Sequence, residues 1–345
     1  MKVGIINVTG YSGIELARIL SRHPEAELAS VTGRSTVGQR LGDVFPHLAA
    51  VNLTITEDIT ESVDVVFSAL PHKASAERLG PFVESGVRAI DISADYRLKD
   101  LRQYEEWYGE HPHPSHVEDA VYGLPELHRD EVAGARLVAN PGCYPTPSIL
   151  ALAPVMAAGL IESDIIVDAK SGVSGAGRSV DVKFLFTEVN ESVRAYGVGA
   201  HRHMPEIAQE LGRLNGNGAA PLSVTFLPHL IPMTRGILAS CYAKFRAGES
   251  LSGESGQRRL MELYRDFFAD HPFVHVADEP PSTKQTLGNN DCRIYPTVDR
   301  STGRLVAVGC IDNLVKGAAG QAVQNMNIMF GMPEQLGLEE LALYP

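Results

Sequence analysis

The first part of the chain repeats short apolar runs that are separated by turns and by segments with helical spacing. Residues 3–8 are a strand-like run, Gly10-Tyr11-Ser12-Gly13 has the composition of a tight turn, and residues 14–23 place apolar side chains at helical intervals. Residues 26–32 form a second strand-like run. This order predicts a βαβ unit at the start of the chain.

Two later runs have the near-continuous hydrophobicity of strands that are buried on both faces of a sheet. Residues 63–70 break at Pro71, and residues 87–92 break at Ser93. Such strands are typical of parallel sheets covered by helices, and their carboxyl ends line the ligand crevice. We therefore predict an α/β fold that begins with a Rossmann-type dinucleotide-binding domain.

The pattern changes after residue 143. Strand-like segments lie at 165–169, 222–227, 237–245 and 305–311, and helical spacing covers 205–214 and 256–269. This predicts an α+β second domain. Residues 316–330 have helical spacing and are apolar enough to pack on the first domain. The predicted domains are a discontinuous NADP-binding domain at 1–142 plus 316–345 and a catalytic and oligomerisation domain at 143–315.

Composition narrows the function to metabolite chemistry. The net charge of −12 and the lack of a basic block disfavour nucleic acid as a partner, and no apolar run is long enough to predict a membrane span. The four cysteines are widely spaced, so we expect reduced thiols and a cytoplasmic protein. The large apolar second domain makes a homo-oligomer plausible.

Cys143 is the candidate nucleophile. It stands in Asn140-Pro141-Gly142-Cys143-Tyr144-Pro145-Thr146-Pro147, just before an apolar run with helical spacing. Pro147 suits the first helical position behind a Thr146 cap, and the dipole there favours a thiolate over a thiol. The alternative is an inert core cysteine, since single cysteines are often buried.

A dinucleotide site is predicted at the first turn. Glycines between a strand and a helix let a pyrophosphate approach the backbone at the helix N-terminus, and Gly10, Tyr11, Ser12 and Gly13 are the candidates. An ordinary tight turn is the alternative.

NADPH is the predicted cofactor. In NAD-specific folds an acidic residue follows the second strand, whereas this strand ends in Gly33-Arg34-Ser35. Arg34 and Ser35 are therefore candidates for holding a 2′-phosphate by charge-assisted hydrogen bonds. The alternative is that Arg34 is only a solvated surface residue.

His201 and His203 are candidates for acid/base chemistry. In an extended segment, residues two apart point the same way, and Pro205 then begins a helix with Glu206 in its first turn. Glu206 is expected to orient one imidazole, and either histidine is a candidate. No metal site is expected, because one cysteine and two histidines supply no fourth zinc ligand.

Five motifs together resemble one enzyme family. They are Asn140-Pro-Gly-Cys-Tyr-Pro-Thr146, Lys170-Ser-Gly-Val-Ser-Gly-Ala-Gly-Arg178, Tyr196-Gly-Val-Gly-Ala-His-Arg-His-Met-Pro-Glu-Ile207, Pro228-His-Leu-Ile-Pro-Met-Thr-Arg-Gly236 and Asp312-Asn-Leu-Val-Lys-Gly-Ala-Ala-Gly-Gln321. The chain resembles the N-acetyl-γ-glutamyl-phosphate reductases of arginine biosynthesis. The resemblance implies NADPH-dependent reduction of an acyl phosphate to an aldehyde through a thioester. One departure is Asn7, where such chains usually carry glycine.

The resemblance also suggests how an anionic substrate is held. The loop at 171–178 offers backbone amides, hydroxyls and a guanidinium, so we assign Ser174, Gly175 and Arg178 to phosphate or to the substrate near the nicotinamide; a flexible loop is the alternative. Tyr196 belongs to the same substrate group. Arg97 is a candidate for the α-carboxylate, or a surface arginine paired to Asp95.

Two further residues are assigned to the cofactor. Asn313 resembles the family position near the nicotinamide amide, and Gly317 is expected to let the last helix approach the cofactor. Simple helix packing is the alternative. For the whole chain, the other functions considered are a carrier-protein-linked aminoadipyl or glutamyl phosphate reductase, an aspartate-semialdehyde dehydrogenase and a non-catalytic nucleotide sensor.

Overall fold

The computed structural model describes residues 1–216, 221–249 and 251–344, and the chain divides into two compact units. Unit 1 comprises Met1–Gly142 and Ala318–Glu340, and unit 2 comprises Cys143–Gly317 with the C-terminal segment from Leu341. Compared with the sequence-based domains, residues 316–317 and the segment from Leu341 lie in unit 2 instead of unit 1.

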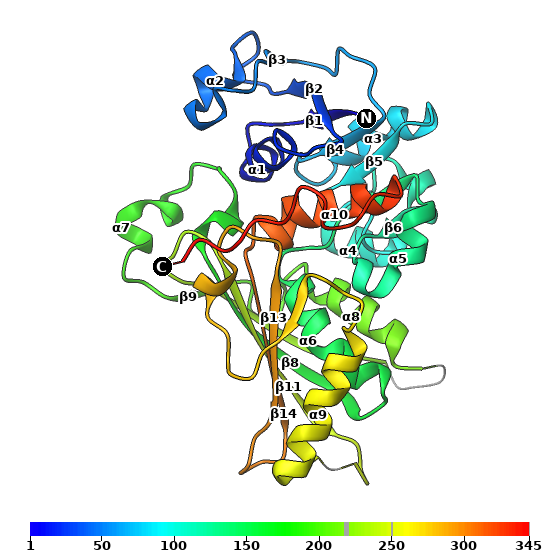
Figure 1. Cartoon of the computed structure of the whole chain (residues 1–345), viewed down its shortest axis with the longest axis vertical. Helices are drawn as coiled ribbons and strands as arrows, with labels where there is room; N and C mark the ends of the chain where they lie inside the picture. Colours follow the sequence, from blue (N-terminus) through cyan, green and yellow to red (C-terminus); the bar gives the residue numbers. More distant parts are fainter. Residues whose placement is uncertain (217–220, 250, 345) are drawn as a thin grey trace. The chain divides into compact units, whose positions relative to one another are not determined.

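Unit 1 contains a parallel sheet whose strands run in the order β3-β2-β1-β4-β5-β7-β6 (Figure 1). The strands are β1 Lys2–Ile6, β2 Glu27–Thr32, β3 Ile55–Thr56, β4 Val65–Ser68, β5 Arg88–Asp91, β6 Val121–Tyr122 and β7 Leu137–Ala139. All four residues of β4 are buried, as expected for a central strand with both faces covered. The order is that of a Rossmann-type domain, which confirms the predicted α/β class.

Helices cover this sheet. They are α1 Tyr11–Leu20, α2 Leu41–Val44, α3 Ala74–Glu84, α4 Leu101–Tyr108, α5 Pro125–Gly134 and α10 Gly320–Met329. On one face, Ala76 and Leu79 of α3 form a core cluster with Ile6, Val66 and Ala89 of the strands. The helix α10 packs against α1 and α5, and every one of its residues is buried.

Unit 2 contains a mixed sheet in the order β12-β13-β14-β11-β8-β10-β9. The strands are β8 Ile161–Ser171, β9 Arg194–Ala195, β10 Ser223–Leu230, β11 Ile237–Phe245, β12 Val274–Val276, β13 Cys292–Val298 and β14 Leu305–Ile311. The predicted strands at 237–245 and 305–311 are confirmed, and β8 and β10 extend beyond their predicted ends. The strands β12 and β13 were not predicted.

The helices of unit 2 are α6 Pro145–Ala157, α7 Phe186–Val189, α8 Met204–Leu214 and α9 Gly253–Phe267. α6 packs on β11 and β14 and also contacts α8 and α9, so these three helices cover one face of the sheet. In β8 the inward residues Ile165, Val167 and Ala169 are buried, whereas Asp168 and Lys170 on the other face are partly exposed. This alternation is typical of a sheet that is covered on one side.

In the segments that the structure describes, no helix is both long and apolar enough to cross a membrane.

Candidate functional site

The first turn lies earlier than predicted. Residues 7–10 make the turn, and α1 begins at Tyr11, so Tyr11, Ser12 and Gly13 form the first turn of the helix. Gly10 is the N-cap and contributes no side-chain acceptor, and the first intrahelical bond runs from Ile14 N–H to the Gly10 carbonyl at 2.9 Å. The preceding amides have no partner within the helix, which gives the N-terminus of α1 the donors that suit a phosphate.

Gly13 allows α1 to pack closely on the turn. A Cβ atom at this position would lie 2.4 Å from the Asn7 carbonyl oxygen and 2.8 Å from Val8 Cα. Any side chain would therefore displace the backbone. At Gly10 the same test finds ordinary contact, 3.6 Å to Asn7 Nδ2.

Asn7 adopts the left-handed backbone conformation for which glycine is usually required. Its φ is 65°, in the left-handed region that asparagine tolerates better than most residues. Its side-chain Nδ2 donates to the Ala69 carbonyl at 2.9 Å, and its backbone N–H donates to Thr32 Oγ1 at 3.1 Å. The turn is thus tied to the ends of β2 and β4, and the departure from glycine leaves its geometry supported.

Arg34 and Ser35 follow β2 directly and are exposed. Val8 N–H donates to the Thr32 carbonyl at 2.8 Å, so the end of β2 lies beside the first turn. No carboxylate occurs in Gly33-Arg34-Ser35. This part of unit 1 therefore offers the backbone amides at the start of α1 and the exposed guanidinium of Arg34. Both kinds of donor suit the phosphates of a dinucleotide.

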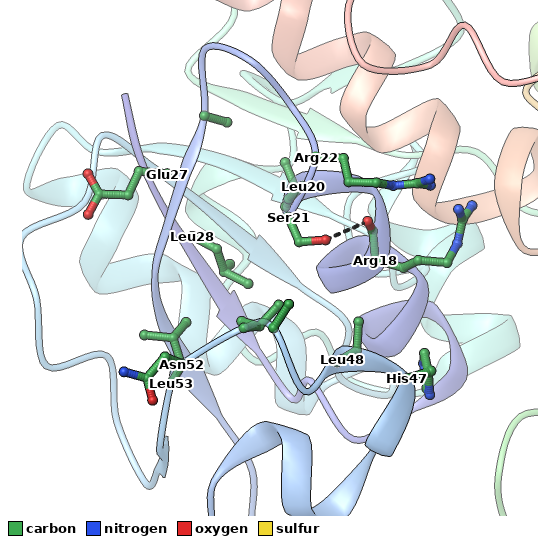
Figure 2. A pocket seen from close by; sticks show the side chains of 13 residues that line it. Arg18, Leu20, Ser21, Arg22, Glu27, Leu28, His47, Leu48, Asn52 and Leu53 are labelled. Atoms are coloured by element: carbon green, nitrogen blue, oxygen red, sulfur yellow. Dashed lines mark hydrogen bonds between the residues drawn. The ribbon is translucent and has the colours of Figure 1, made fainter.

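Unit 1 also has a cavity of about 650 Å³ that involves none of the predicted site residues (Figure 2). Its lining includes Arg18 in the last turn of α1, Arg22 in the turn after that helix, and Glu27 and Leu28 at the amino end of β2. Both arginines form ion pairs with Glu340. Because ligands of such sheets bind at the carboxyl ends of the strands, this cavity is at the wrong end for the dinucleotide.

Cys143 stands immediately before α6 and is partly exposed. The predicted cap is wrong: the helix begins at Pro145, with Tyr144 as N-cap and no side-chain capping bond, so Thr146 lies inside the first turn. Pro145 suits this position because its fixed φ matches the helix and its missing N–H needs no partner.

Gly317 makes room for Cys143. A Cβ at this position would lie 3.0 Å from Cys143 Cβ and 3.3 Å from its Cα. Gly317 belongs to a π-helical turn, Val315–Ala319, and its N–H donates to the Asp312 carbonyl at 3.0 Å. Such turns are frequent at functional sites. Within unit 2, the absence of a side chain here therefore leaves room for the Cα and Cβ of Cys143.

Aromatic rings gather around the nucleophile candidate. We call Tyr144, Tyr196, His201, His203 and Phe226 the aromatic cluster. The Tyr196 hydroxyl donates to the Tyr144 hydroxyl at 3.0 Å, and Tyr144 donates to the His229 carbonyl at 3.2 Å. Burial raises the pKa of both phenols, and the charge of Cys143 raises them further. Both phenols therefore stay protonated near the thiol, and each already donates its proton within the site.

The histidine pair lies in this cluster, but its segment is not extended. Residues 202–203 form a turn, and His203 is the N-cap of α8 with helical φ and ψ. The two imidazole centroids are 4.9 Å apart, and the His201 ring lies 5.5 Å from Tyr196 and 5.0 Å from Phe226. The prediction that the two rings lie together is confirmed, but a turn brings them together and not the alternation of a strand.

His201 is electrically neutral at pH 7. Burial lowers its pKa to about 4, and the nearby charge of Arg202 acts in the same direction. The backbone N–H of His203 donates to His201 Nδ1 at 3.2 Å. Neutral His201 therefore carries its proton on Nε2 and presents that atom as a donor. Glu206 lies in the first turn of α8 and is buried, and its predicted role in orienting an imidazole stays a prediction.

The predicted anion cradle at 171–178 is partly wrong. The amides of Gly172, Val173 and Ser174 donate to the carbonyls of Gly236, Met233 and Thr234, so they are already used. The Ser174 hydroxyl accepts from Asn313 Nδ2 at 2.9 Å, while Asn313 Oδ1 accepts from Gly236 N–H at 2.7 Å. Asn313 thus fastens the loop within unit 2. Gly175 and Arg178 are exposed.

Arg97 is not a surface residue. It is 7% exposed, and its guanidinium donates to the carbonyls of Asn140 at 2.8 Å and Ile92 at 2.9 Å. Asp95 accepts from the Lys73 and Ala76 amides and from the Tyr104 hydroxyl. The surface position in the alternative is therefore wrong, and the α-carboxylate role stays a prediction.

The sequence analysis missed Tyr144 and Phe226 as parts of the site. Tyr144 follows Cys143 directly, which was an available signal, but Phe226 is an inward residue of β10 that only the sheet register brings to His201.

Comparisons with known proteins agree with this architecture. Residues 2–135 match the family described as "Semialdehyde dehydrogenase, NAD binding domain", and residues 143–313 match "Semialdehyde dehydrogenase, dimerisation domain". Among solved structures, an aspartate semialdehyde dehydrogenase II from Vibrio cholerae superposes with a TM-score of 0.70 at 16% identity, covering 96% of this chain and 98% of that one. An aspartate semialdehyde dehydrogenase with NADP from Candida albicans gives 0.70 at 17% identity, covering 95% and 98%. At these identities the likeness shows the fold alone.

Relatives of much higher identity show the family. An N-acetyl-gamma-glutamyl-phosphate reductase of Dehalococcoides mccartyi is 57% identical over 345 residues, covering 100% of this chain and 99% of the relative. One of Geotalea daltonii is 51% identical over 354 residues and is covered, like this chain, to 100%. The chain belongs to the N-acetyl-γ-glutamyl-phosphate reductase family of semialdehyde dehydrogenases.

Proposed function

We propose that this protein catalyses the NADPH-dependent reduction of N-acetyl-γ-glutamyl phosphate to N-acetylglutamate semialdehyde and phosphate, a step of arginine biosynthesis. The observation that carries the proposal is the full-length identity of 57% to a reductase of that name. The position of Cys143 beside the aromatic cluster supports it, because covalent catalysis by a thiol needs acid/base groups such as the imidazoles of His201 and His203 nearby.

Cys143 is the nucleophile in this proposal. Its sulfur attacks the acyl carbon, the bond from that carbon to the phosphate oxygen breaks, and a thioester forms as phosphate leaves. Addition of hydride and a proton to the thioester carbonyl gives a thiohemiacetal. Its carbon–sulfur bond then breaks as the hydroxyl loses its proton, which releases the aldehyde and the thiolate. Dividing the reaction at the thioester replaces one difficult step by two easier ones.

His201 and His203 are assigned the proton transfers of this reaction. The carbonyl oxygen gains negative charge when hydride arrives, and the Nε2–H of neutral His201 is a donor for that oxygen. When the thiohemiacetal collapses, its hydroxyl proton must be removed. Because Nε2 of His201 already carries a proton and Nδ1 accepts a backbone hydrogen bond, His203 is proposed as the base that removes it. Glu206, in the first turn of the helix that His203 caps, is proposed to orient one of the two rings.

The residues of unit 1 fit NADP. The cofactor supplies hydride when bound. Gly10, Tyr11, Ser12 and Gly13 would hold its pyrophosphate at the N-terminus of α1, and Arg34 with Ser35 would hold the 2′-phosphate. By family resemblance, Asn313 and Gly317 are assigned to the nicotinamide end.

Substrate binding is assigned by resemblance to Ser174, Gly175, Arg178 and Tyr196, with Arg97 for the α-carboxylate. Arg178 supplies the one guanidinium of the 171–178 loop, and Tyr196 adds a phenol hydroxyl beside the nucleophile. A guanidinium and hydroxyls suit a substrate that carries a carboxylate, an amide and a phosphate.

Unit 2 is proposed to mediate self-association. Its sheet leaves Ile166, Asp168 and Lys170 of β8 partly exposed on the face opposite α6, and the segment matches a family named for dimerisation. We also assign the enzyme to the cytoplasm, where the thiol that the mechanism requires stays reduced.

A steady-state assay in the reverse direction tests the function. With NADP⁺ and inorganic phosphate, the protein is expected to oxidise N-acetylglutamate semialdehyde with a far higher kcat/KM than aspartate semialdehyde. Equal or greater efficiency with aspartate semialdehyde would contradict the assignment.

A further inference from the structure

We propose that Glu84, His113 and His116 form a binding site for a divalent transition-metal ion of the zinc class. We call these residues the Glu84 cluster. They offer one carboxylate oxygen and two ring nitrogens that all lie within 4.8 Å of one another. The cluster lies within unit 1 and has no role in the proposed reaction.

The fold directs these side chains toward a common point. Glu84 is the last residue of α3. His113 is the N-cap of the short 3₁₀ turn Pro114–His116, and His116 is its last residue. A Cβ at Gly80 would lie 2.6 Å from His113 Nε2, so glycine is what lets the imidazole rest on this part of α3. Residues 80 and 84 share one side of the helix, and His113 Nε2 is accordingly 3.5 Å from Glu84 Oε1.

The surroundings of both imidazoles suit metal ligands. His113 Nδ1 lies 3.1 Å from Ser115 Oγ, so an Nδ1–H can donate there while the lone pair on Nε2 faces Glu84. Metal-bound histidines are typically oriented by such a bond from the second nitrogen. The His116 ring stacks on His113 at 5.1 Å and 6°, and its Nε2 is buried with no hydrogen-bond partner among the described residues. A buried polar atom of this kind normally has a partner, which an ion would supply.

The donor set selects the kind of ion. Two imidazoles and one carboxylate, with a fourth position for water, suit Zn²⁺ and also Co²⁺ or Ni²⁺. Ca²⁺ and Mg²⁺ prefer sets made of oxygen ligands. Without an ion, the same geometry supports only a Glu84–His113 ion pair when the imidazole is protonated.

Zinc titration of the full chain by calorimetry at neutral pH tests the site. All chains carry Cys143→Ser, because Cys143 with the nearby histidines offers a competing set of ligands. One zinc per chain is expected, with affinity at least about tenfold weaker after His116→Ala or Glu84→Gln and unchanged after His47→Ala, which removes an exposed histidine elsewhere in unit 1.

A thermal melt gives an independent readout, because an ion that binds the folded state raises the melting temperature. Zinc is expected to raise it for the Cys143→Ser chain and for His47→Ala but not for His116→Gln, a variant that keeps the side-chain size and whose zinc-free circular dichroism checks its folding. The proposal is overturned if zinc does not bind saturably, or if it binds the His116 and Glu84 variants as tightly as the parent.

Discussion

The two units present their candidate site residues in different ways. In unit 1 the features that fit a dinucleotide are mostly backbone: the amides at the start of α1, the close packing at Gly13 and the left-handed Asn7. In unit 2 the features that fit thiol chemistry are side chains, namely Cys143 and the aromatic cluster. A binding surface made of backbone depends on local conformation, whereas a reactive site made of side chains depends on the register of distant segments.

This difference predicts two separable kinds of variant. Changes in the first turn of unit 1 should alter stability or cofactor affinity and leave the chemistry of the thiol intact. Changes in the aromatic cluster should alter the rate of the chemical steps.

The largest effect is expected at the histidine pair. Separate His201→Asn and His203→Asn variants should include one whose kcat falls by about 10²–10⁴-fold, since general acid/base catalysis is typically worth that much. Steady-state kinetics of both variants provides the measurement. If both keep kcat and only KM rises, the pair binds substrate and the side-chain chemistry assigned to unit 2 lies elsewhere.

The buried imidazole should also give unit 2 a pH-dependent stability. The pKa of His201 is about 4 in the folded chain and about 6.5 in the unfolded chain. Between these pH values the unfolded chain binds a proton at this residue and the folded chain does not. The free energy of unfolding should fall by roughly 3 kcal/mol as the pH drops through this window.

Comparison with His201→Asn isolates this term. In unit 1, burial and the charge of Asp95 raise the pKa of Asp91 to about 6, which acts in the opposite sense: its contribution to stability is present below the unfolded pKa and is lost as the pH rises through 6. Denaturant unfolding from pH 4 to 7 measures both chains. Parallel profiles of parent and His201→Asn would show that His201 is not the buried neutral base described here.

The glycines of the first turn offer a matched pair. Gly13→Ala places a Cβ 2.4 Å from the Asn7 carbonyl oxygen and should cost about 1–3 kcal/mol, whereas Gly10→Ala makes ordinary contact and should stay within about 0.5 kcal/mol. Both variants should keep the parental rate of Cys143 alkylation. Equal destabilisation by the two changes would contradict the packing role assigned to Gly13.

The smallest effect is expected at Arg34. Removing a charge-assisted contact to the 2′-phosphate in Arg34→Ala should lower the preference for NADPH over NADH by about tenfold, or about 1.4 kcal/mol, without changing kcat for hydride transfer. Ratios of kcat/KM for the two cofactors measure it. An unchanged preference would remove Arg34 from the cofactor site.

Features that depend on local sequence were predicted correctly more often than features that depend on contacts between distant segments. Near-continuous apolar strands and a strand–turn–helix start are local signals, so the Rossmann-type class was predictable, and the motif resemblance identified the family. Pro145 still displaced the start of α6 by two residues, because either proline of this segment satisfies the first helical position.

Tertiary arrangements were less accessible. Spacing placed His201 and His203 together, but a turn and not an extended segment does so. The sequence suggests that the amides of the 171–178 loop can bind an anion, but in the structure carbonyls of the 233–236 segment accept hydrogen bonds from three of them. Phe226 beside His201 and Gly317 against Cys143 depend on pairings between distant segments, which periodicity does not encode.

The most direct test of the account is to trap the acyl-enzyme. Incubation with N-acetyl-γ-glutamyl phosphate in the absence of NADPH should release one phosphate per chain and leave an acyl adduct on Cys143, detected by peptide mass spectrometry, that NADPH then discharges. The Cys143→Ala variant should form no adduct while binding NADPH with nearly parental affinity. An adduct that persists in Cys143→Ala, or reduction without any adduct in the parent, would contradict the thioester mechanism.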